Sequence, residues 1–133
     1  MFNYKTRIHL RDTDATGVLY FAEQFRLCLE AFENYLGESQ LPLQKLIDES
    51  AFLLPIVHAE SDYALPLYAG DEISIALSVG KIGTTSFTLQ YKLFKQGKEA
   101  GHASIVHVTV SQETQKPVPI PEKLSKLLSH LQK

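Results

Sequence analysis

One long stripe of apolar residues at helical spacing constrains the fold of this chain more than any other feature. The stripe lies on residues 18–36 and consists of Phe21, Phe25, Cys28, Leu29, Phe32, Tyr35 and Leu36. Residues three and four apart share one face of an α-helix, so this segment is predicted to be a helix with a broad apolar face. Gly37 follows where helices commonly end.

Five other segments have the alternation of β-strands. Along residues 2–10 the more apolar side chains occupy every second position, which is typical of a half-buried strand. The other four are residues 55–65, 73–79, 87–93 and 103–110, with turn-forming sequences YAGD, KIGTTS and KQGKEAG between them. Shorter helices are predicted over residues 41–50 and over residues 121–133, which begin with Pro121.

The order of these elements predicts an α+β fold. The long helix is the only element large enough to cover one face of an antiparallel five-stranded sheet, and a sheet wrapped around a central helix is the hotdog architecture. With 133 residues, the chain is expected to form one domain over residues 1–133. The second face and the edges of such a sheet are usually hidden by dimerisation.

Charge narrows the range of binding partners, and cysteine content indicates the cellular location. The net charge is −2 without a block of like charges, which disfavours nucleic acid and anionic membrane surfaces as partners. No run reaches the roughly 20 apolar residues of a membrane span. A single cysteine cannot form an internal disulfide, so a reducing, cytoplasmic location is expected. The stroma of an organelle remains an alternative if the chain is processed after import.

The segment DTDATGVLYFAE, residues 12–23, allows three interpretations. Asp12, Asp14, Thr16, Gly17 and Glu23 nearly fit the spacing of an EF-hand calcium loop, but that loop needs a preceding helix and residues 2–10 alternate as a strand. The carboxylates could instead only stabilise a turn. They could also belong to a catalytic turn. No Cys/His cluster exists, and His102 and His107 are predicted to face opposite sides of a strand, so a metal site is not expected.

The pattern D-x-D-x-x-G-V-x-Y-F, after a strand and before a long apolar helix, resembles the signature of the 4-hydroxybenzoyl-CoA thioesterase family of hotdog enzymes. The similarity covers most of the chain. The segment FLLPIVHAESDYALPLYAGDEI is most similar to the 1,4-dihydroxy-2-naphthoyl-CoA thioesterases of phylloquinone synthesis. This resemblance implies an acyl-CoA thioesterase without a cofactor, because coenzyme A is part of the substrate.

The resemblance also implies roles for three residues. Asp14 would be the catalytic carboxylate, either attacking the thioester carbonyl or activating water as a general base. The backbone N–H of Phe21, at the amino end of the helix, would stabilise the negative charge that develops on the carbonyl oxygen. Gly17 would let the turn approach the acyl group closely. Asp14 is expected to be ionised near a helix start, and Asp12 is expected to form the turn and could tune Asp14.

A further group of residues is predicted to bind substrate. Phe25 could border the acyl pocket, and His58 could either hydrogen-bond an aromatic hydroxyl or contact solvent or another subunit. Thr84, Thr85 and Ser86 in the KIGTTS turn could hold the CoA phosphates, although Lys81 is the only basic residue there and the segment could be an ordinary hairpin.

The expected function is therefore hydrolysis of an aromatic acyl-CoA, with 1,4-dihydroxy-2-naphthoyl-CoA of phylloquinone or menaquinone synthesis as the most specific candidate. Dimers that assemble into tetramers are expected, with active sites at subunit interfaces. A broad thioesterase for short or medium acyl chains remains an alternative, and so does a non-catalytic acyl-CoA or acyl-carrier binding module. Such a binder would have no need of a carboxylate at Asp14.

Overall fold

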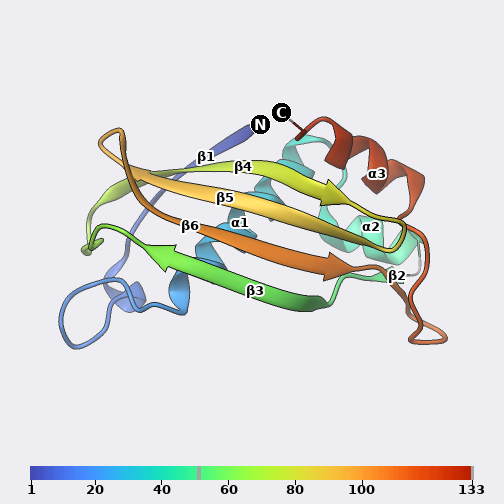
Figure 1. Cartoon of the computed structure of the whole chain (residues 1–133), viewed down its shortest axis with the longest axis horizontal. Coiled ribbons are helices and arrows are strands. Elements are labelled where there is room, and N and C mark those ends of the chain that lie inside the picture. The colour runs from blue at the N-terminus through green and yellow to red at the C-terminus, as the bar shows by residue number, and fades with distance from the viewer. Residues whose placement is uncertain (51, 133) are drawn as a thin grey trace.

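The structure is a computed structural model that describes residues 1–50 and 52–132 (Figure 1). Residue 133, the last of the predicted C-terminal helix, lies outside this part. The elements in chain order are β1 (Phe2–Arg7), a 3-10 helix η1 (Leu10–Asp12), α1 (Glu23–Glu38), α2 (Leu43–Ser50), β2 (Phe52–Leu53), β3 (Ile56–Tyr63), β4 (Glu72–Ile82), β5 (Ser86–Lys95), β6 (Lys98–Val108), β7 (Val110–Ser111) and α3 (Glu122–Ser129).

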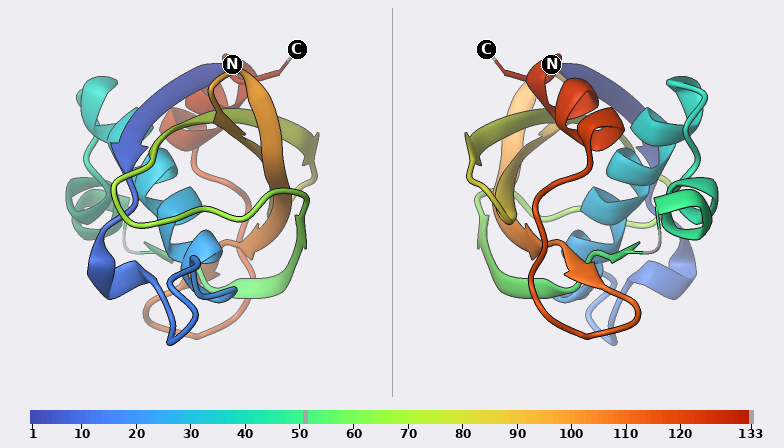
Figure 2. Two further views of the ribbon diagram at one scale, coloured as in Figure 1. Left: turned by 90° about the vertical axis from the view of Figure 1, so that its left-hand side faces the viewer. Right: turned by 90° about the vertical axis from the view of Figure 1, so that its right-hand side faces the viewer.

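The predicted sheet around a central helix is confirmed. Five strands form one antiparallel sheet in the order β1-β4-β5-β6-β3. Seen end-on, the sheet curves around α1 (Figure 2). Alternate residues of the strands point to the helix and are buried, among them Ile75, Leu77, Leu89, Leu93 and Ile105. They meet the buried face of α1, where Leu27, Cys28, Ala31, Phe32 and Leu36 lie.

The long helix begins later than the sequence predicts, at Glu23 rather than residue 18. The segment before it is tied to a neighbouring loop, because Leu19 N–H donates to Leu67 O (2.7 Å) and Val18 forms a bridge with Tyr68. Phe21 consequently lies outside the apolar stripe and is 59% exposed. Its predicted place in the stripe was wrong, since the chain has not yet entered the helix there.

The carboxyl end of α1 also differs from the prediction. Gly37 lies inside the last turn, and Ser39 is the C-cap. Both the backbone N–H and the hydroxyl of Ser39 donate to Tyr35 O, at 3.0 and 2.8 Å. These bonds satisfy a terminal carbonyl of the helix, so no glycine is required for the cap.

Two strand boundaries differ for local reasons. β1 ends at Arg7 and not at residue 10, because the chain turns into η1 and leaves Leu10 79% exposed. β6 begins at Lys98 and not at residue 103. Gln96 and Gly97 both have positive φ angles, 51° and 77°, and make a two-residue turn that lets pairing start at once. The predicted KQGKEAG loop is mostly strand for this reason.

The C-terminal helix closes one end of the space between the sheet and α1 (Figure 2). Leu124, Leu128 and Leu131 are buried there, and Tyr35 of α1 donates its hydroxyl hydrogen bond to Leu127 O at 2.6 Å. The opposite end, at the start of α1, carries the loop of residues 13–22 (Figure 1). In the described part of the chain, no helix has the length and apolar character needed to cross a membrane.

Candidate active site

Asp14 lies in a tight turn between η1 and α1. Its backbone N–H donates to Val18 O, and Gly17 N–H donates to Asp14 O, each at 3.0 Å. Gly17 has a φ of +82°, a conformation that side chains other than glycine rarely adopt. A Cβ at Gly17 would meet no atom within 4 Å, so the turn conformation, and not crowding, accounts for the glycine. Its close approach to an acyl group stays a prediction.

The Asp14 carboxylate is exposed, and Thr16 donates two hydrogen bonds to it. The backbone N–H and the hydroxyl of Thr16 donate to Oδ1, at 2.8 and 2.5 Å. These bonds favour the charged form, so the Thr16 hydroxyl above all lowers the pKa of Asp14 from its usual value. The carboxylate is therefore ionised at neutral pH. The cause is Thr16 rather than the helix start, which lies nine positions away at Glu23.

A cavity of about 410 Å³ joins Asp14 to the amino end of α1. It is lined by Asp14, residues 18–21, Gln24 and residues 63–67. Phe21 N–H and Ala22 N–H donate no hydrogen bond to any other described residue. Such free donors at a helix start, where the helix dipole is positive, suit a developing oxyanion. The structure thus brings Asp14 and Phe21, the two residues predicted for these roles, to one cavity.

Two residues of this cavity were not foreseen. The Tyr63 hydroxyl, at the end of β3, donates to Phe21 O at 2.6 Å and holds the peptide that precedes α1. Gln24 is 1% exposed and donates its side-chain amide to Ser61 Oγ and Asp62 O. Gln24 had a signal in the sequence: it stands four residues before Cys28, on the apolar face, where a polar residue needs a reason.

Comparison with known proteins decides the family. The sequence profile of the thioesterase-like superfamily matches residues 8–128, which is most of the chain. The chain belongs to this superfamily. It is therefore a thioesterase-family hydrolase with the hotdog fold, and its general activity is that of an acyl-CoA thioesterase.

Individual relatives of this thioesterase cover nearly all of it. It is 35% identical to the 1,4-dihydroxy-2-naphthoyl-CoA hydrolase of Microcystis aeruginosa over 128 residues, 96% of this chain and 93% of that protein. The crystal structure of a 1,4-dihydroxy-2-naphthoyl-CoA thioesterase from Synechocystis superposes with a TM-score of 0.90 at 30% identity, covering 98% of this chain and 96% of the other. A gentisyl-coenzyme A thioesterase superposes with a TM-score of 0.83 at 28% identity, covering 92% and 98%.

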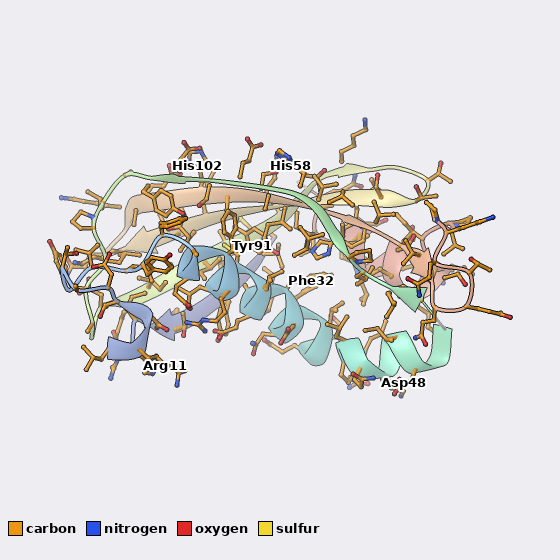
Figure 3. All side chains as sticks on the ribbon, turned by 90° about the horizontal axis from the view of Figure 1, so that it is seen from below. Arg11, Phe32, Asp48, His58, Tyr91 and His102 are labelled. Carbon is orange, nitrogen blue, oxygen red and sulfur yellow. The ribbon has the colours of Figure 1, made fainter. Side chains whose placement is uncertain are left out.

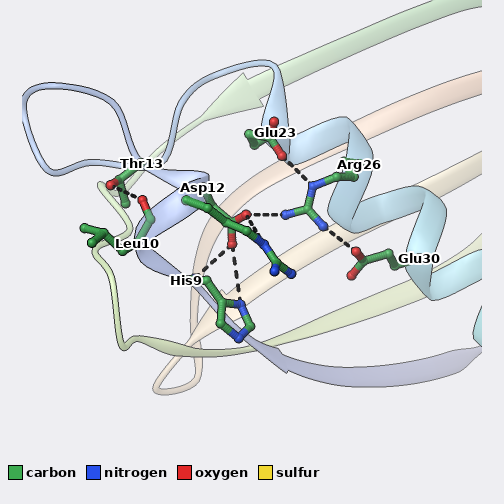
Figure 4. A network of polar contacts seen from close by, with 8 residues as sticks. His9, Leu10, Asp12, Thr13, Glu23, Arg26 and Glu30 are labelled. Atoms are coloured by element: carbon green, nitrogen blue, oxygen red, sulfur yellow. Dashed lines mark hydrogen bonds and ion pairs between the residues drawn. The ribbon is translucent and has the colours of Figure 1, made fainter.

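Asp12 of the thioesterase stabilises the loop, as predicted, through contacts that the sequence did not reveal (Figure 4). Its Oδ2 accepts a hydrogen bond from His9 N–H at 2.8 Å, and its Oδ1 pairs with Arg26 of α1. Arg26 also pairs with Glu23 and Glu30. Because this carboxylate is buried and directed at a guanidinium, it does not fit the calcium-loop interpretation. In the described residues, no group of three or more His, Cys, Asp or Glu could hold a metal ion.

The other residues predicted to bind substrate are not among those that line the Asp14 cavity of the same chain. Phe25 is partly buried against the core. His58 is exposed on β3 and points to the side of the sheet away from α1, 3.9 Å from Glu60 (Figure 3). The hairpin between β4 and β5, which holds Thr84, Thr85 and Ser86, lies at the opposite end of the molecule from the Asp14 loop (Figure 1). Substrate contacts by these residues remain predictions.

The hairpin has its own structural partners. Ile120 N–H donates to Thr84 O, and Thr109 N–H donates to Thr85 O, at 2.9 and 2.8 Å. These bonds join the hairpin to the segment that leads to α3. The strand histidines face opposite ways, as predicted: His102 is exposed and His107 is buried.

Proposed function

We propose that this thioesterase hydrolyses 1,4-dihydroxy-2-naphthoyl-CoA to 1,4-dihydroxy-2-naphthoate and coenzyme A, with Asp14 as the catalytic carboxylate. The main support is the cavity that Asp14 shares with the free N–H of Phe21. The names of the relatives at about one-third identity support the acyl group.

The chemistry follows from the positions of these two groups. The Asp14 carboxylate is exposed and lines the cavity, so it is available to react. It either attacks the thioester carbon, giving an anhydride that water then hydrolyses, or removes a proton from an attacking water. In both routes the carbonyl oxygen becomes negative next to Phe21 N–H, the C–S bond breaks, and the CoA thiolate leaves and takes up a proton.

The proposal includes assembly into dimers and tetramers. In one chain the predicted CoA-binding hairpin and the Asp14 cavity lie at opposite ends of the molecule. A second copy would have to bring its hairpin to the cavity for Thr84, Thr85 and Ser86 to contact the same substrate. The exposed edge strand β3 offers a surface for that association.

The test is hydrolysis of an acyl-CoA panel by the wild type and by Asp14→Asn. The panel contains 1,4-dihydroxy-2-naphthoyl-CoA, benzoyl-type thioesters and straight-chain thioesters. Asp48→Asn is the matched control, because Asp48 is an exposed carboxylate on α2 (Figure 3). We expect Asp14→Asn to lower kcat by about 1000-fold or more, with the fold and oligomer size unchanged, and Asp48→Asn to have no effect.

The outcomes separate the alternatives. A sharp, Asp14-dependent preference for the naphthoyl thioester supports the proposal. Similar rates on straight chains of many lengths point to a broad thioesterase. An absence of Asp14-dependent hydrolysis on the whole panel contradicts the proposed catalytic role and favours a binding module.

A further inference from the structure

Gln24 is a buried polar residue that the proposed hydrolysis does not use. It lies in the first turn of α1, is 1% exposed, and lines the same cavity as Asp14. Its side chain packs against Gly101 of β6, where a Cβ would stand 3.0 Å from Gln24 Nε2 and 2.7 Å from Asp62 O. Glycine at position 101 thus leaves room for the amide, which is held between α1 and the sheet.

The hydrogen bonds of Gln24 fix which end of the amide is free. Nε2 donates to Asp62 O at 3.2 Å and to Ser61 Oγ at 2.6 Å, and the Ser61 hydroxyl donates onward to His102 O at 3.3 Å. A backbone carbonyl can only accept, so the amino group must face Asp62. Oε1 receives no hydrogen bond from a side chain or backbone group in the described part of the chain. The amide is held through its amino group, so Oε1 is the end that is available to accept a hydrogen bond.

We propose that Gln24 determines acyl specificity: its Oε1 accepts a hydrogen bond from a donor group, above all a hydroxyl, on the acyl ring. The inference rests on the proposed function and names the feature of the acyl group that this site selects. An acyl group that covers Oε1 without offering a donor leaves this acceptor unpaired in the complex, which costs free energy, so such an acyl group is disfavoured. An acyl group with a hydroxyl in reach removes that cost.

The first experiment compares paired substrates on the wild-type protein. 1-Hydroxy-, 4-hydroxy- and 1,4-dihydroxy-2-naphthoyl-CoA are compared with 2-naphthoyl-CoA and with the analogues that carry methyl in place of hydroxyl, which are close in size but lack the donor. We expect kcat/KM to be about 10- to 100-fold higher for at least one hydroxylated substrate than for its methyl or unsubstituted counterpart. Equal kcat/KM values across the series would overturn the inference. An amino analogue that is accepted as well as the hydroxyl supports the acceptor role with either donor.

The second experiment uses Gln24→Met, which keeps the length of the side chain and removes the acceptor. We expect the ratio of kcat/KM for a hydroxylated substrate to kcat/KM for 2-naphthoyl-CoA to fall toward 1. The reason is that kcat/KM drops for the hydroxylated substrates and changes little for 2-naphthoyl-CoA. Gln44→Met is the matched control on the exposed side of α2 and should keep the preference. An equal loss on all substrates would show that Gln24 only supports the structure, and would contradict the inference.

Two further measurements keep the test decisive. If Gln24→Met does not fold, Ser61→Ala replaces it: it removes one partner that orients the amide and should reduce the preference in the same direction. If the wild type hydrolyses no thioester, the proposed function fails, and calorimetry with the free acids takes over. Tighter binding of a hydroxy-2-naphthoate than of 2-naphthoate, lost in the variant, would still support the role of Gln24, and equal binding would overturn it.

Discussion

The carboxylate of Asp12 pairs with the guanidinium of Arg26 and so ties the loop that carries Asp14 to the helix whose amino end borders the cavity. Asp12 is 1% exposed and Arg26 is 36% exposed on its side chain. The pair therefore links a buried group of the loop to a half-buried group of α1. Glu23 and Glu30 flank the guanidinium and share its charge.

Replacing Asp12 by Asn is expected to destabilise the fold. The amide loses the charge that faces Arg26, and hydrogen bonds to charged groups contribute about 1.5–3 kcal/mol, so a loss near 2 kcal/mol in the free energy of unfolding is expected. Urea unfolding measures this. Glu72→Gln is the control, because Glu72 pairs with Arg7 at an exposed site and should cost less than about 1 kcal/mol. Equal costs in the two variants would refute a special role for Asp12.

Replacing Tyr63 by Phe is expected to lower kcat about 10-fold while KM changes little. The lost hydroxyl no longer holds Phe21 O, so the peptide at the start of α1 can move away from the position that suits an oxyanion. Steady-state kinetics on the preferred acyl-CoA measures kcat and KM separately. Tyr68→Phe serves as the control, because Tyr68 is exposed to a similar extent in the neighbouring loop. A rise in KM at constant kcat would assign Tyr63 to substrate binding instead.

Replacing Thr16 by Val is expected to raise the pKa of Asp14 toward its usual value. The Thr16 hydroxyl bond is the largest cause of the lowered pKa, and valine removes that donor while keeping the backbone N–H. An NMR titration of the carboxyl carbon of Asp14 in both proteins measures the shift directly. An unchanged titration midpoint would show that the Thr16 hydroxyl does not contribute and that the backbone hydrogen bonds lower the pKa of Asp14.

Acidification is expected to destabilise the protein through His107. Burial lowers the pKa of His107 in the folded state, and its Nδ1 lies 3.1 Å from Leu54 O. In the unfolded chain His107 binds a proton below about pH 6.5, whereas in the folded protein it stays neutral to a lower pH. The free energy of unfolding is therefore highest above pH 6.5. It falls as the pH is lowered, by at most about 1.4 kcal/mol per pH unit. Urea unfolding at pH 7.5, 6.5 and 5.5 measures the slope.

His107→Phe isolates this contribution, since His107 stacks on Phe87 with ring centroids 5.3 Å apart and phenylalanine keeps an aromatic ring at this position without a titratable group. The variant should have a shallower pH dependence over that range than the wild type. His102→Asn, at an exposed position on the same strand, controls for general histidine titration. Identical slopes in wild type and His107→Phe would rule out His107 as the cause.

The fold was predictable where side-chain periodicity determines the structure. The alternation along β4 and β5 and the stripe from Phe25 to Leu36 record burial directly, so the sheet and helix follow from them. The start of α1 was not predictable in this way. Leu19 falls inside the predicted helix of residues 18–36, but its N–H donates to Leu67 O, which is distant in the sequence. Local periodicity cannot report such a long-range partner.

The residues of the candidate site likewise include some that the sequence could identify and others that it could not. Asp14 and Phe21 could be selected from a local motif, and they border one cavity. The contacts of Asp12 with Arg26, of Tyr63 with Phe21 and of Gln24 with Asp62 join segments 14 to 42 positions apart. No short motif encodes them, because each depends on how α1 packs against β3 and the loop.

The pairing of β1 with β4 has a consequence for the order of folding. β4, β5 and β6 are joined by short turns, so they can pair with little loss of chain entropy. Phe2 of β1 pairs with Leu77 of β4, which is far away in the sequence. Closing so long a loop carries a larger entropy cost, so this pairing forms late. The segment inside the loop holds α1 and the turn of Asp14. We therefore expect the Asp14 cavity to become ordered late in folding, when the amino-terminal strand docks.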